Sequence, residues 1–261
     1  MLEDLYAGAL SDAESRLAKY SLADLAVAAE AQASALDTIS ILSAGNTINV
    51  IAEIKRASPS KGFLAEIANP AELARTYEAA GAAAISVLTE ERKFKGNLSD
   101  LAQVRQAVSV PILRKDFIAI EQQVLEARVA GADIALLIVA GLDQATLQHL
   151  VRFVESLGMT PFVETHNKEE VHRAIDTGAN MIGINARDLS TFETDRELFA
   201  TLVDLLPRDA IAVAESAVRN LDDVIAYAKA GADCVLVGEA LVTGDAAQLL
   251  SEFTSVTKIR L

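Results

Sequence analysis

Four short apolar runs along the chain are each preceded by a similar small-residue turn. Each turn holds a glycine that follows a helically patterned segment, where the residue ending a helix takes positive φ. The runs are rich in aliphatic side chains, as expected of parallel strands buried on both faces. The pairs are Gly81 before Ala84–Leu88, Gly131 before Ile134–Val139, Gly178 before Met181–Ile184 and Gly231 before Cys234–Val237. The glycines lie 50, 47 and 53 residues apart, which is about twice the length of one βα unit.

Further apolar runs fill the gaps: Val50–Lys55, Pro111–Asp116, Thr160–Glu164 and Ile211–Glu215. Eight runs that alternate with helical patterns predict an α/β protein, a closed (β/α)8 TIM barrel with right-handed crossovers. Residues 1–48 have helical patterning, and Ser21–Asp24 resembles a capping box. We therefore expect one domain over residues 1–261, with an N-terminal helical extension (1–48) packed on a barrel (49–261). An open doubly wound sheet is the alternative, but it usually has fewer strands, and no Gly-rich fingerprint follows the first strand.

The charge balance narrows the class of function. The chain has 23 basic and 37 acidic residues, a net charge of −14, and 51% of its residues are apolar. That composition is ordinary for a globular protein, whereas a nucleic-acid binder or a polybasic membrane-surface protein needs a basic footprint. The longest uncharged apolar run, Ile134–Leu142, is far too short to span a bilayer. We expect no nucleic-acid partner and no membrane association.

Cysteine and histidine usage gives no sign of a metal site. The single thiol, Cys234, permits no internal disulfide, and its place at the start of the last predicted strand indicates a core residue. His149, His166 and His172 lack metal-binding spacing, and each is expected on a helix surface. Acidic residues occupy positions 3 and 4, where an export signal would carry positive charge. The sequence thus predicts a cytoplasmic protein.

Ionisable side chains gather where the apolar runs end, and the active site of such a barrel lies at the carboxyl ends of its strands. These side chains are Glu53, Lys55, Lys115, Glu164, Asn185 and Glu215, with Arg187 shortly after Asn185. Any one of them could be a rim salt bridge, but their coincidence at several strands favours a site. Lys115 and Glu164 are the strongest candidates for catalytic residues. Lysine can act as a general acid or a Schiff-base nucleophile, and glutamate can act as a general base or a second acid. We expect burial to favour the protonated form of Glu164 and a nearby lysine to oppose it.

Two loops are candidates for binding an anion. The phosphate site of this fold commonly lies in the loops after the seventh and eighth barrel strands. Ser216 occupies the first loop and Gly238–Glu239 the second, where backbone N–H groups could face an anion. Taken alone these are weak motifs. The polar, basic segment Ser58–Gly62 is either a plain turn or a flexible lid with anion contacts.

Longer motifs resemble those of the indole-3-glycerol-phosphate synthase family. The most specific is Ile51–Gly62, with the sequence IAEIKRASPSKG. The others follow in order: Leu88–Glu90 with Phe94 and Gly96, Pro111–Phe117, Glu164–His166, Gly183–Leu189, Ala214–Ser216 and Val237–Leu241. The resemblance covers the whole chain, including the N-terminal extension.

The resemblance implies a ring closure with loss of CO2 and water. The substrate is 1-(2-carboxyphenylamino)-1-deoxyribulose 5-phosphate, and the product is indole-3-glycerol phosphate, in tryptophan biosynthesis. No metal, organic cofactor or obligate protein partner is implied. A substrate with a phosphate and a carboxylate needs local Lys and Arg, which this chain supplies despite its net negative charge.

The resemblance also implies a role for each candidate residue. Lys115 is the general acid that protonates the ribulose carbonyl oxygen, Glu164 takes part in the proton transfers of dehydration, and Lys55 positions the substrate and can donate a proton. Glu53 and Asn185 orient the reacting groups, and Glu215 supports the network. The implied substrate contacts are Ser58 and Arg187 for anions, Ser216, Gly238 and Glu239 for the phosphate, and Phe94, Phe117 and Leu136 for the aryl ring, although these three could equally be ordinary packing.

One position departs from the family pattern, and two other functions remain as alternatives. The family usually has glycine after the serine of the seventh strand, where this chain has Ala217; if φ is positive there, alanine costs about 1 kcal/mol or more. Phosphoribosylanthranilate isomerase, on a similar barrel, has a catalytic Cys where this chain has Glu53 and Lys55. A non-catalytic barrel that binds a phosphorylated ligand is the other alternative, against which the retention of Lys115 and Glu164 argues.

Overall fold

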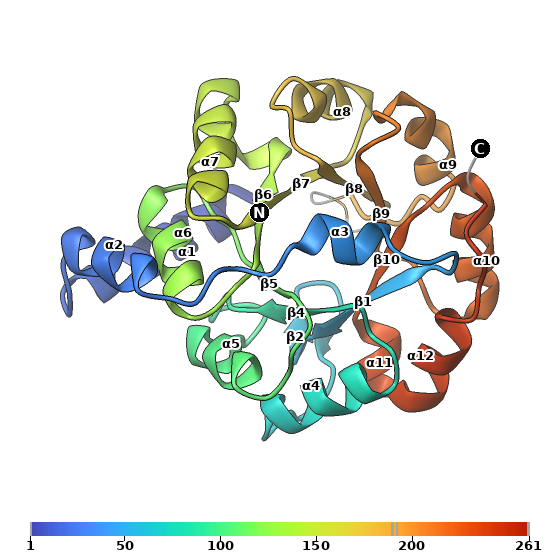
Figure 1. The fold of residues 1–261 in the computed structure, drawn as a ribbon, viewed down its shortest axis with the longest axis horizontal. Coiled ribbons are helices and arrows are strands. Elements are labelled where there is room, and N and C mark those ends of the chain that lie inside the picture. Colours follow the sequence, from blue (N-terminus) through green and yellow to red (C-terminus); the bar gives the residue numbers. More distant parts are fainter. Residues whose placement is uncertain (1, 189–190, 192, 260–261) are drawn as a thin grey trace.

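Parallel strands close into an eight-stranded barrel in the computed structural model, which describes residues 2–188, 191 and 193–259 (Figure 1). Strands that follow one another along the barrel pair in parallel, and the last pairs with the first. They are β1 (Asn49–Ile54), β4 (Ala84–Leu88), β5 (Ile112–Lys115), β6 (Ile134–Ile138), β7 (Thr160–Thr165), β8 (Met181–Asn185), β9 (Ile211–Glu215) and β10 (Cys234–Val237). The predicted barrel and each of its strands are confirmed. Leu189, at the end of one motif, lies outside the described residues.

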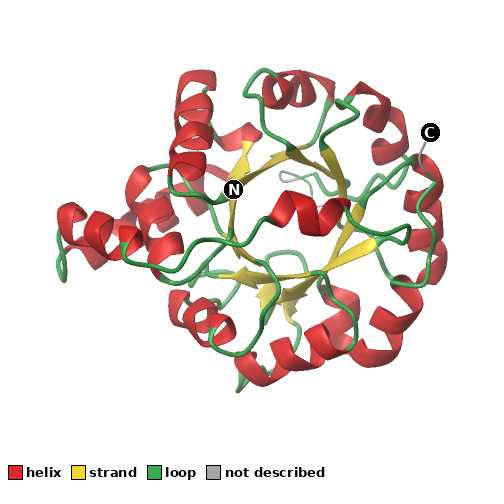
Figure 2. Ribbon diagram, in the orientation of Figure 1, coloured by secondary structure: helices red, strands yellow, loops and turns green. Residues whose placement is uncertain are grey.

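Helices alternate with the strands and surround the barrel (Figure 2). They are α4 (Pro70–Ala79), α5 (Leu98–Arg105), α6 (Glu121–Val129), α7 (Gln144–Ser156), α8 (Lys168–Ile175), α9 (Leu198–Leu202), α10 (Leu221–Ala230), α11 (Glu239–Thr243) and α12 (Ala246–Phe253), with short 3₁₀ turns at Val139–Gly141 and Val203–Leu205. The glycines of the repeated turn all have positive φ, at 100°, 94°, 79° and 105° in chain order. Each allows the chain to leave a helix and enter the next strand without a Cβ clash.

The core lies inside the barrel and between the strands and their helices. Every residue of β4, β6, β8, β9 and β10 is buried, which explains why these strands lack polar alternation. Cys234 is fully buried, as predicted. None of the helices within residues 2–188 and 193–259 is long and apolar enough to cross a membrane.

Three helices precede the barrel: α1 (Leu2–Leu17), α2 (Leu22–Glu30) and α3 (Thr38–Ser43). The capping box at Ser21 is present, with Ser21 and Asp24 each bonding the backbone N–H of the other. α2 packs on α6 through Leu25, Ala29 and Leu125. α3 runs across the opening of the barrel (Figure 1), and its Leu42 is fully buried. The predicted helical extension is therefore present and ends where β1 begins.

The segment after β1 is more ordered than the sequence suggested. It forms a small antiparallel hairpin from β2 (Ala57–Ser58) and β3 (Gly62–Phe63). Gly62 has a φ of 69°, and Ser58 Oγ accepts a hydrogen bond from the backbone N–H of Lys61. The predicted turn is thus the tip of a hairpin, joined directly to the carboxyl end of a barrel strand.

Candidate active site

The carboxyl ends of the strands surround a cavity of about 810 Å³. The structure brings every candidate residue from the sequence to its wall: Glu53, Lys55, Ser58, Phe94, Lys115, Phe117, Leu136, Glu164, Asn185, Arg187, Glu215, Ser216, Gly238 and Glu239. They come from seven of the eight strands and the segments that follow them, together with the segment after β4. Polar groups that converge on one cavity beside a few apolar and aromatic side chains are typical of a small-molecule site.

Lys115 lies between two buried carboxylates at the centre of this cavity. Its Nζ donates to Glu164 Oε2 at 2.9 Å and to Glu215 Oε2 at 3.0 Å. The other oxygen of Glu164 accepts a hydrogen bond from Asn185 Nδ2 at 3.0 Å. Glu164 and Glu215 are each only 1% exposed, so these charges interact with little screening by water.

The pKa values of the two glutamates are shifted in opposite directions. Burial favours the protonated form of Glu164, but Lys115 and His166 outweigh it and hold the pKa of this carboxyl well below its usual range. Burial together with the neighbouring charge of Glu164 raises the pKa of Glu215 to about 8. Burial also disfavours the cation of Lys115, yet the two carboxylates raise its pKa above the ordinary value. Both opposing effects expected for Glu164 are present, and the effect of the cations is the larger; Glu215 is instead the glutamate whose pKa lies near neutral pH.

A second ion pair lies at the carboxyl end of β1, which pairs with β4 and β10. Lys55 Nζ is 2.6 Å from Glu53 Oε1, and this carboxylate is 2% exposed. Gly238, after β10, closes over the pair: a Cβ at this position would lie closer to Glu53 Oε1 than van der Waals contact permits and 3.0 Å from Lys55 Nζ. A larger residue here would therefore have to displace the ends of the Glu53 and Lys55 side chains.

Polar and basic groups lie around the mouth of the cavity. Arg187 Nη1 donates to Ser60 Oγ at 3.0 Å, which links the hairpin to the segment after β8. Lys61 Nζ lies 3.6 Å from Glu239 Oε1, across the same mouth. Ser216 and Ala217 have φ values of 63° and 64°, so the positive φ suspected at Ala217 is present.

The apolar wall is built partly by the N-terminal helix. The ring centroids of Phe94 and Phe117 are 6.1 Å apart, and Tyr6 of α1 packs edge-on against Phe117 at 5.6 Å. Leu136 completes the wall from β6. The segment carrying Phe94 is held by Glu90, whose buried carboxylate accepts the backbone N–H groups of residues 92, 93 and 94. The wall suits a flat apolar ring.

Comparisons with known proteins agree with this geometry. The family model for indole-3-glycerol phosphate synthase matches residues 2–253. An indole-3-glycerol phosphate synthase of Leifsonia xyli is 57% identical over 256 residues, 98% of both chains. Another, of Beutenbergia cavernae, is 55% identical over 243 residues, which are 93% of this chain and 90% of that protein.

The chain belongs to the indole-3-glycerol phosphate synthase family. It is therefore a carboxy-lyase of tryptophan biosynthesis, and the family's substrate is a phosphorylated, carboxylated small molecule. The barrel is shared more widely. An N-acetylmannosamine-6-phosphate 2-epimerase from Clostridium perfringens has a TM-score of 0.63 and 16% identity, covering 86% of this chain and 98% of that one. At that identity the likeness shows the fold alone.

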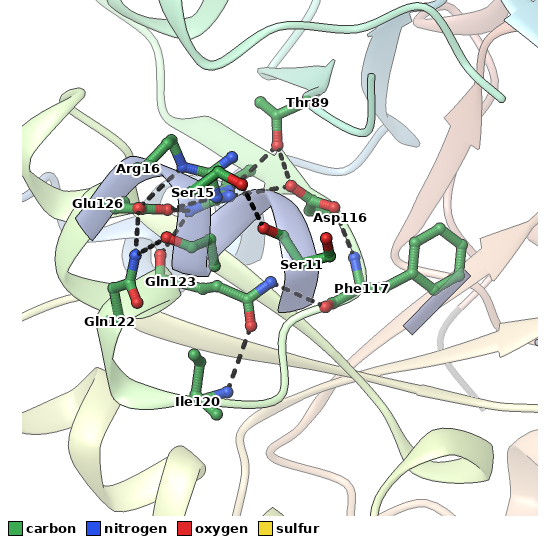
Figure 3. A network of polar contacts seen from close by, with 12 residues as sticks. Ser11, Ser15, Arg16, Thr89, Asp116, Phe117, Ile120, Gln122, Gln123 and Glu126 are labelled. Carbon is green, nitrogen blue, oxygen red and sulfur yellow. Dashed lines mark hydrogen bonds and ion pairs between the residues drawn. The ribbon is translucent and has the colours of Figure 1, made fainter. Parts of the chain in front are cut away.

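Behind the site, a buried polar network supports the strand that carries Lys115 (Figure 3). Arg114 points away from the cavity, is 1% exposed, and donates to Thr89 Oγ1, Asp116 Oδ2 and the carbonyl oxygen of residue 123. Glu126 lies 3.4 Å from Arg114 and accepts two hydrogen bonds of 2.8 Å from Arg16 of α1. This network ties α1 and α6 to β5, and so restrains the backbone on both sides of Lys115.

Sequence reasoning misplaced one residue and missed others. His166 was expected on a helix surface, but it directly follows β7, and its side chain is 10% exposed between Glu164 and Glu170. The spacing Glu-x-His on a strand was the available signal, since it places the histidine on the same face as Glu164. Arg196 and Arg219 also line the cavity, as does Leu5 of α1. No local pattern identified these three, because only the folded loops and the docked helix bring them there.

Proposed function

We propose that this cavity closes the indole ring of 1-(2-carboxyphenylamino)-1-deoxyribulose 5-phosphate, with loss of CO2 and water. The observation that carries the proposal is Lys115, whose ammonium group is held between the side chains of Glu164 and Glu215 at the centre of the cavity. A fixed ammonium group there can donate a proton to a substrate oxygen that develops negative charge. No metal or organic cofactor is needed for these steps.

The reaction proceeds in three stages. The ring carbon that bears the carboxylate attacks the ribulose carbonyl carbon, and Lys115 protonates the carbonyl oxygen as the carbon–carbon bond forms. The carbon–carboxylate bond then breaks, CO2 leaves, and its electron pair restores the aromatic ring. In the last stage the new hydroxyl leaves as water on a proton from Lys55, while Glu164 accepts the proton released from the intermediate.

The remaining groups orient the substrate and stabilise its charges. Asn185 and Glu53 hold Glu164 and Lys55 in position through the contacts described above. Glu215, which keeps its own proton near neutral pH, supports Lys115 without fully cancelling its charge. The substrate contacts that we propose are Ser58 and Arg187 for the carboxylate, Ser216, Gly238 and Glu239 with their backbone for the phosphate, and Phe94, Phe117 and Leu136 for the aryl ring.

We also propose that residues 1–261 act as one domain, without an obligate protein partner. The support is the contact of Tyr6 with Phe117 and of Arg16 with Glu126, because both join the N-terminal extension to the wall and floor of the cavity. The cytoplasmic location stays a prediction of the sequence.

The test is turnover of this substrate, followed by the fluorescence of the indole product. We expect a steady increase in indole emission with the wild-type protein and a loss of it in Lys115→Met. His149→Gln, which changes an exposed residue of α7 outside the cavity, is the matched control and keeps full activity. Saturable binding of the substrate without any indole emission would instead support a non-catalytic binding barrel.

A further inference from the structure

His166 contacts Glu164 on the side away from Lys115, and the steps proposed above do not use it. Its Nε2 lies 3.2 Å from Glu164 Oε1, without the alignment of a full hydrogen bond. Its Nδ1 lies 3.0 Å from Glu170 Oε2. The ring thus bridges the proposed catalytic glutamate and a second carboxylate from α8.

Glu170 is itself held in place. Its Oε2 accepts the backbone N–H of His166 at 2.8 Å, and its Oε1 accepts Asn167 Nδ2 at 2.7 Å. Asn167 caps the start of α8 by accepting the backbone N–H of Glu170. The turn from β7 into α8 therefore fixes the orientation of the imidazole ring relative to Glu164.

The charges around this ring favour the imidazolium. Glu164 faces it from β7 and Glu170 from α8. Burial disfavours the cation, but the two carboxylates outweigh burial and raise the pKa of His166 to about 10. Glu164 in turn faces Lys115 from β5, the protonated Glu215 from β9 and the neutral Asn185 from β8. His166 is thus the second cation on Glu164, independent of Lys115.

We propose that His166, oriented by Glu170, is a positioning residue that keeps Glu164 ionised while Lys115 is engaged with the substrate. The inference rests on the role of Glu164 proposed above. When Lys115 turns its protons toward the substrate oxygen, Glu164 loses the stabilisation of one cation. A carboxylate that has become protonated cannot accept the proton of the dehydration step. During the dehydration step, the positive charge of His166 keeps Glu164 ionised. The turn at the start of α8 keeps the His166 ring pointing at Glu164.

The first experiment is the pH profile of kcat for the wild type, His166→Gln and the control His172→Gln, because kcat reports the ionisations of the enzyme–substrate complex, in which Lys115 is engaged. Glutamine keeps a hydrogen-bonding side chain but removes the positive charge. An opposite charge at this distance lowers a carboxyl pKa by roughly 1 to 3, so we expect the acidic limb of the H166Q profile to move up by about one pH unit or more. His172, an exposed residue of α8, leaves the profile unchanged when replaced. The substrate's own ionisations are common to all three proteins and cancel in the comparison.

The second experiment observes the ring directly and does not require the H166Q protein to be active. Nitrogen NMR of labelled histidine, with Glu170→Gln and the control Glu169→Gln, reports the protonation of His166. We expect the ring to stay protonated up to about pH 8.5 in the wild type and in E169Q, and its midpoint to fall by about one pH unit or more in E170Q. A wild-type ring that titrates near its ordinary value, about 6.5, would overturn the proposal.

The outcomes separate this inference from the proposed function. If Glu164→Gln retains normal turnover, the role of Glu164 fails, and the inference fails with it. If E164Q loses turnover but H166Q keeps the acidic limb in its wild-type position, the inference alone is wrong. A uniform loss of activity in H166Q at every pH, with the limb unmoved, would indicate a purely structural histidine and would also overturn it.

Discussion

Ala217 has a backbone conformation that costs free energy, so its replacement by glycine is expected to stabilise the protein. Its φ is 64°, in the left-handed region, which costs a residue with a Cβ roughly 1–2 kcal/mol. Glycine removes this cost but loses more conformational entropy on folding, about 0.4–1 kcal/mol. The expected net gain for Ala217→Gly is therefore between about 0 and 1.6 kcal/mol, equivalent to a rise in Tm of at most about 3–6 °C for a chain of this size.

The measurement is thermal unfolding by calorimetry, together with denaturant unfolding of the same proteins. Ala31→Gly is the matched control, because Ala31 is exposed and ends α2 with a φ of −76°. Glycine at position 31 loses more conformational entropy on folding than alanine does and relieves no backbone strain. We therefore expect Ala31→Gly to destabilise the protein by about 0.5–1 kcal/mol. The difference between the two variants isolates the free energy stored at Ala217.

The same variant tests the assignment of this loop to substrate binding. Ser216 and Ala217 are consecutive residues with positive φ at the cavity wall, and glycine can keep this geometry. We expect the affinity of Ala217→Gly for the substrate to be preserved or improved. An equal destabilisation of A217G and A31G would refute the strain argument, and a tenfold loss of substrate affinity would refute the role of the loop.

Three further changes test the site and its support. Lys115→Met is expected to lose at least about a hundredfold in kcat, the low end of general-acid contributions; near-normal turnover of the folded variant removes Lys115 from the mechanism. Glu164→Gln is expected to lower single-turnover rates far more than the affinity for a non-reactive analogue; the reverse result would make Glu164 a residue that only binds. Glu126→Gln is expected to lower the free energy of unfolding at neutral pH by about 3–5 kcal/mol. Burial raises the pKa of Glu126, but Arg16 and Arg114 lower it below the ordinary value, so its stabilisation is present above about pH 4.3 and is lost as pH falls. Urea unfolding should therefore show the two proteins converging in acid, and a difference that is constant with pH would contradict this account.

The barrel could be predicted because its strands are buried on both faces. That burial produces uninterrupted aliphatic runs, and the helices between them end at glycines with positive φ. The hairpin β2–β3 has two residues in each strand, which is too short to produce any periodicity. The contact of Tyr6 with Phe117 could not be predicted from the sequence either, because it depends on how α1 packs against a strand that is distant in the sequence.

The sequence predicted which residues line this cavity, but not how the pKa values of its two buried glutamates differ. Glu164 and Glu215 both end buried aliphatic strands, so their local sequences give no reason for different protonation. In the structure they share one lysine, and burial together with the negative charge of Glu164 raises the pKa of its neighbour Glu215. Which of the two has the lower pKa depends on their other contacts. Glu164 also contacts Asn185 and His166. Glu215 Oε1, in contrast, has no hydrogen-bond partner among the described residues. In the mechanism proposed above, Glu164 is therefore the carboxylate that accepts a proton, and Glu215 is the one that keeps its own. This asymmetry, set by a residue after β7 and a residue of β8, allows two chemically identical side chains to serve different parts of one reaction.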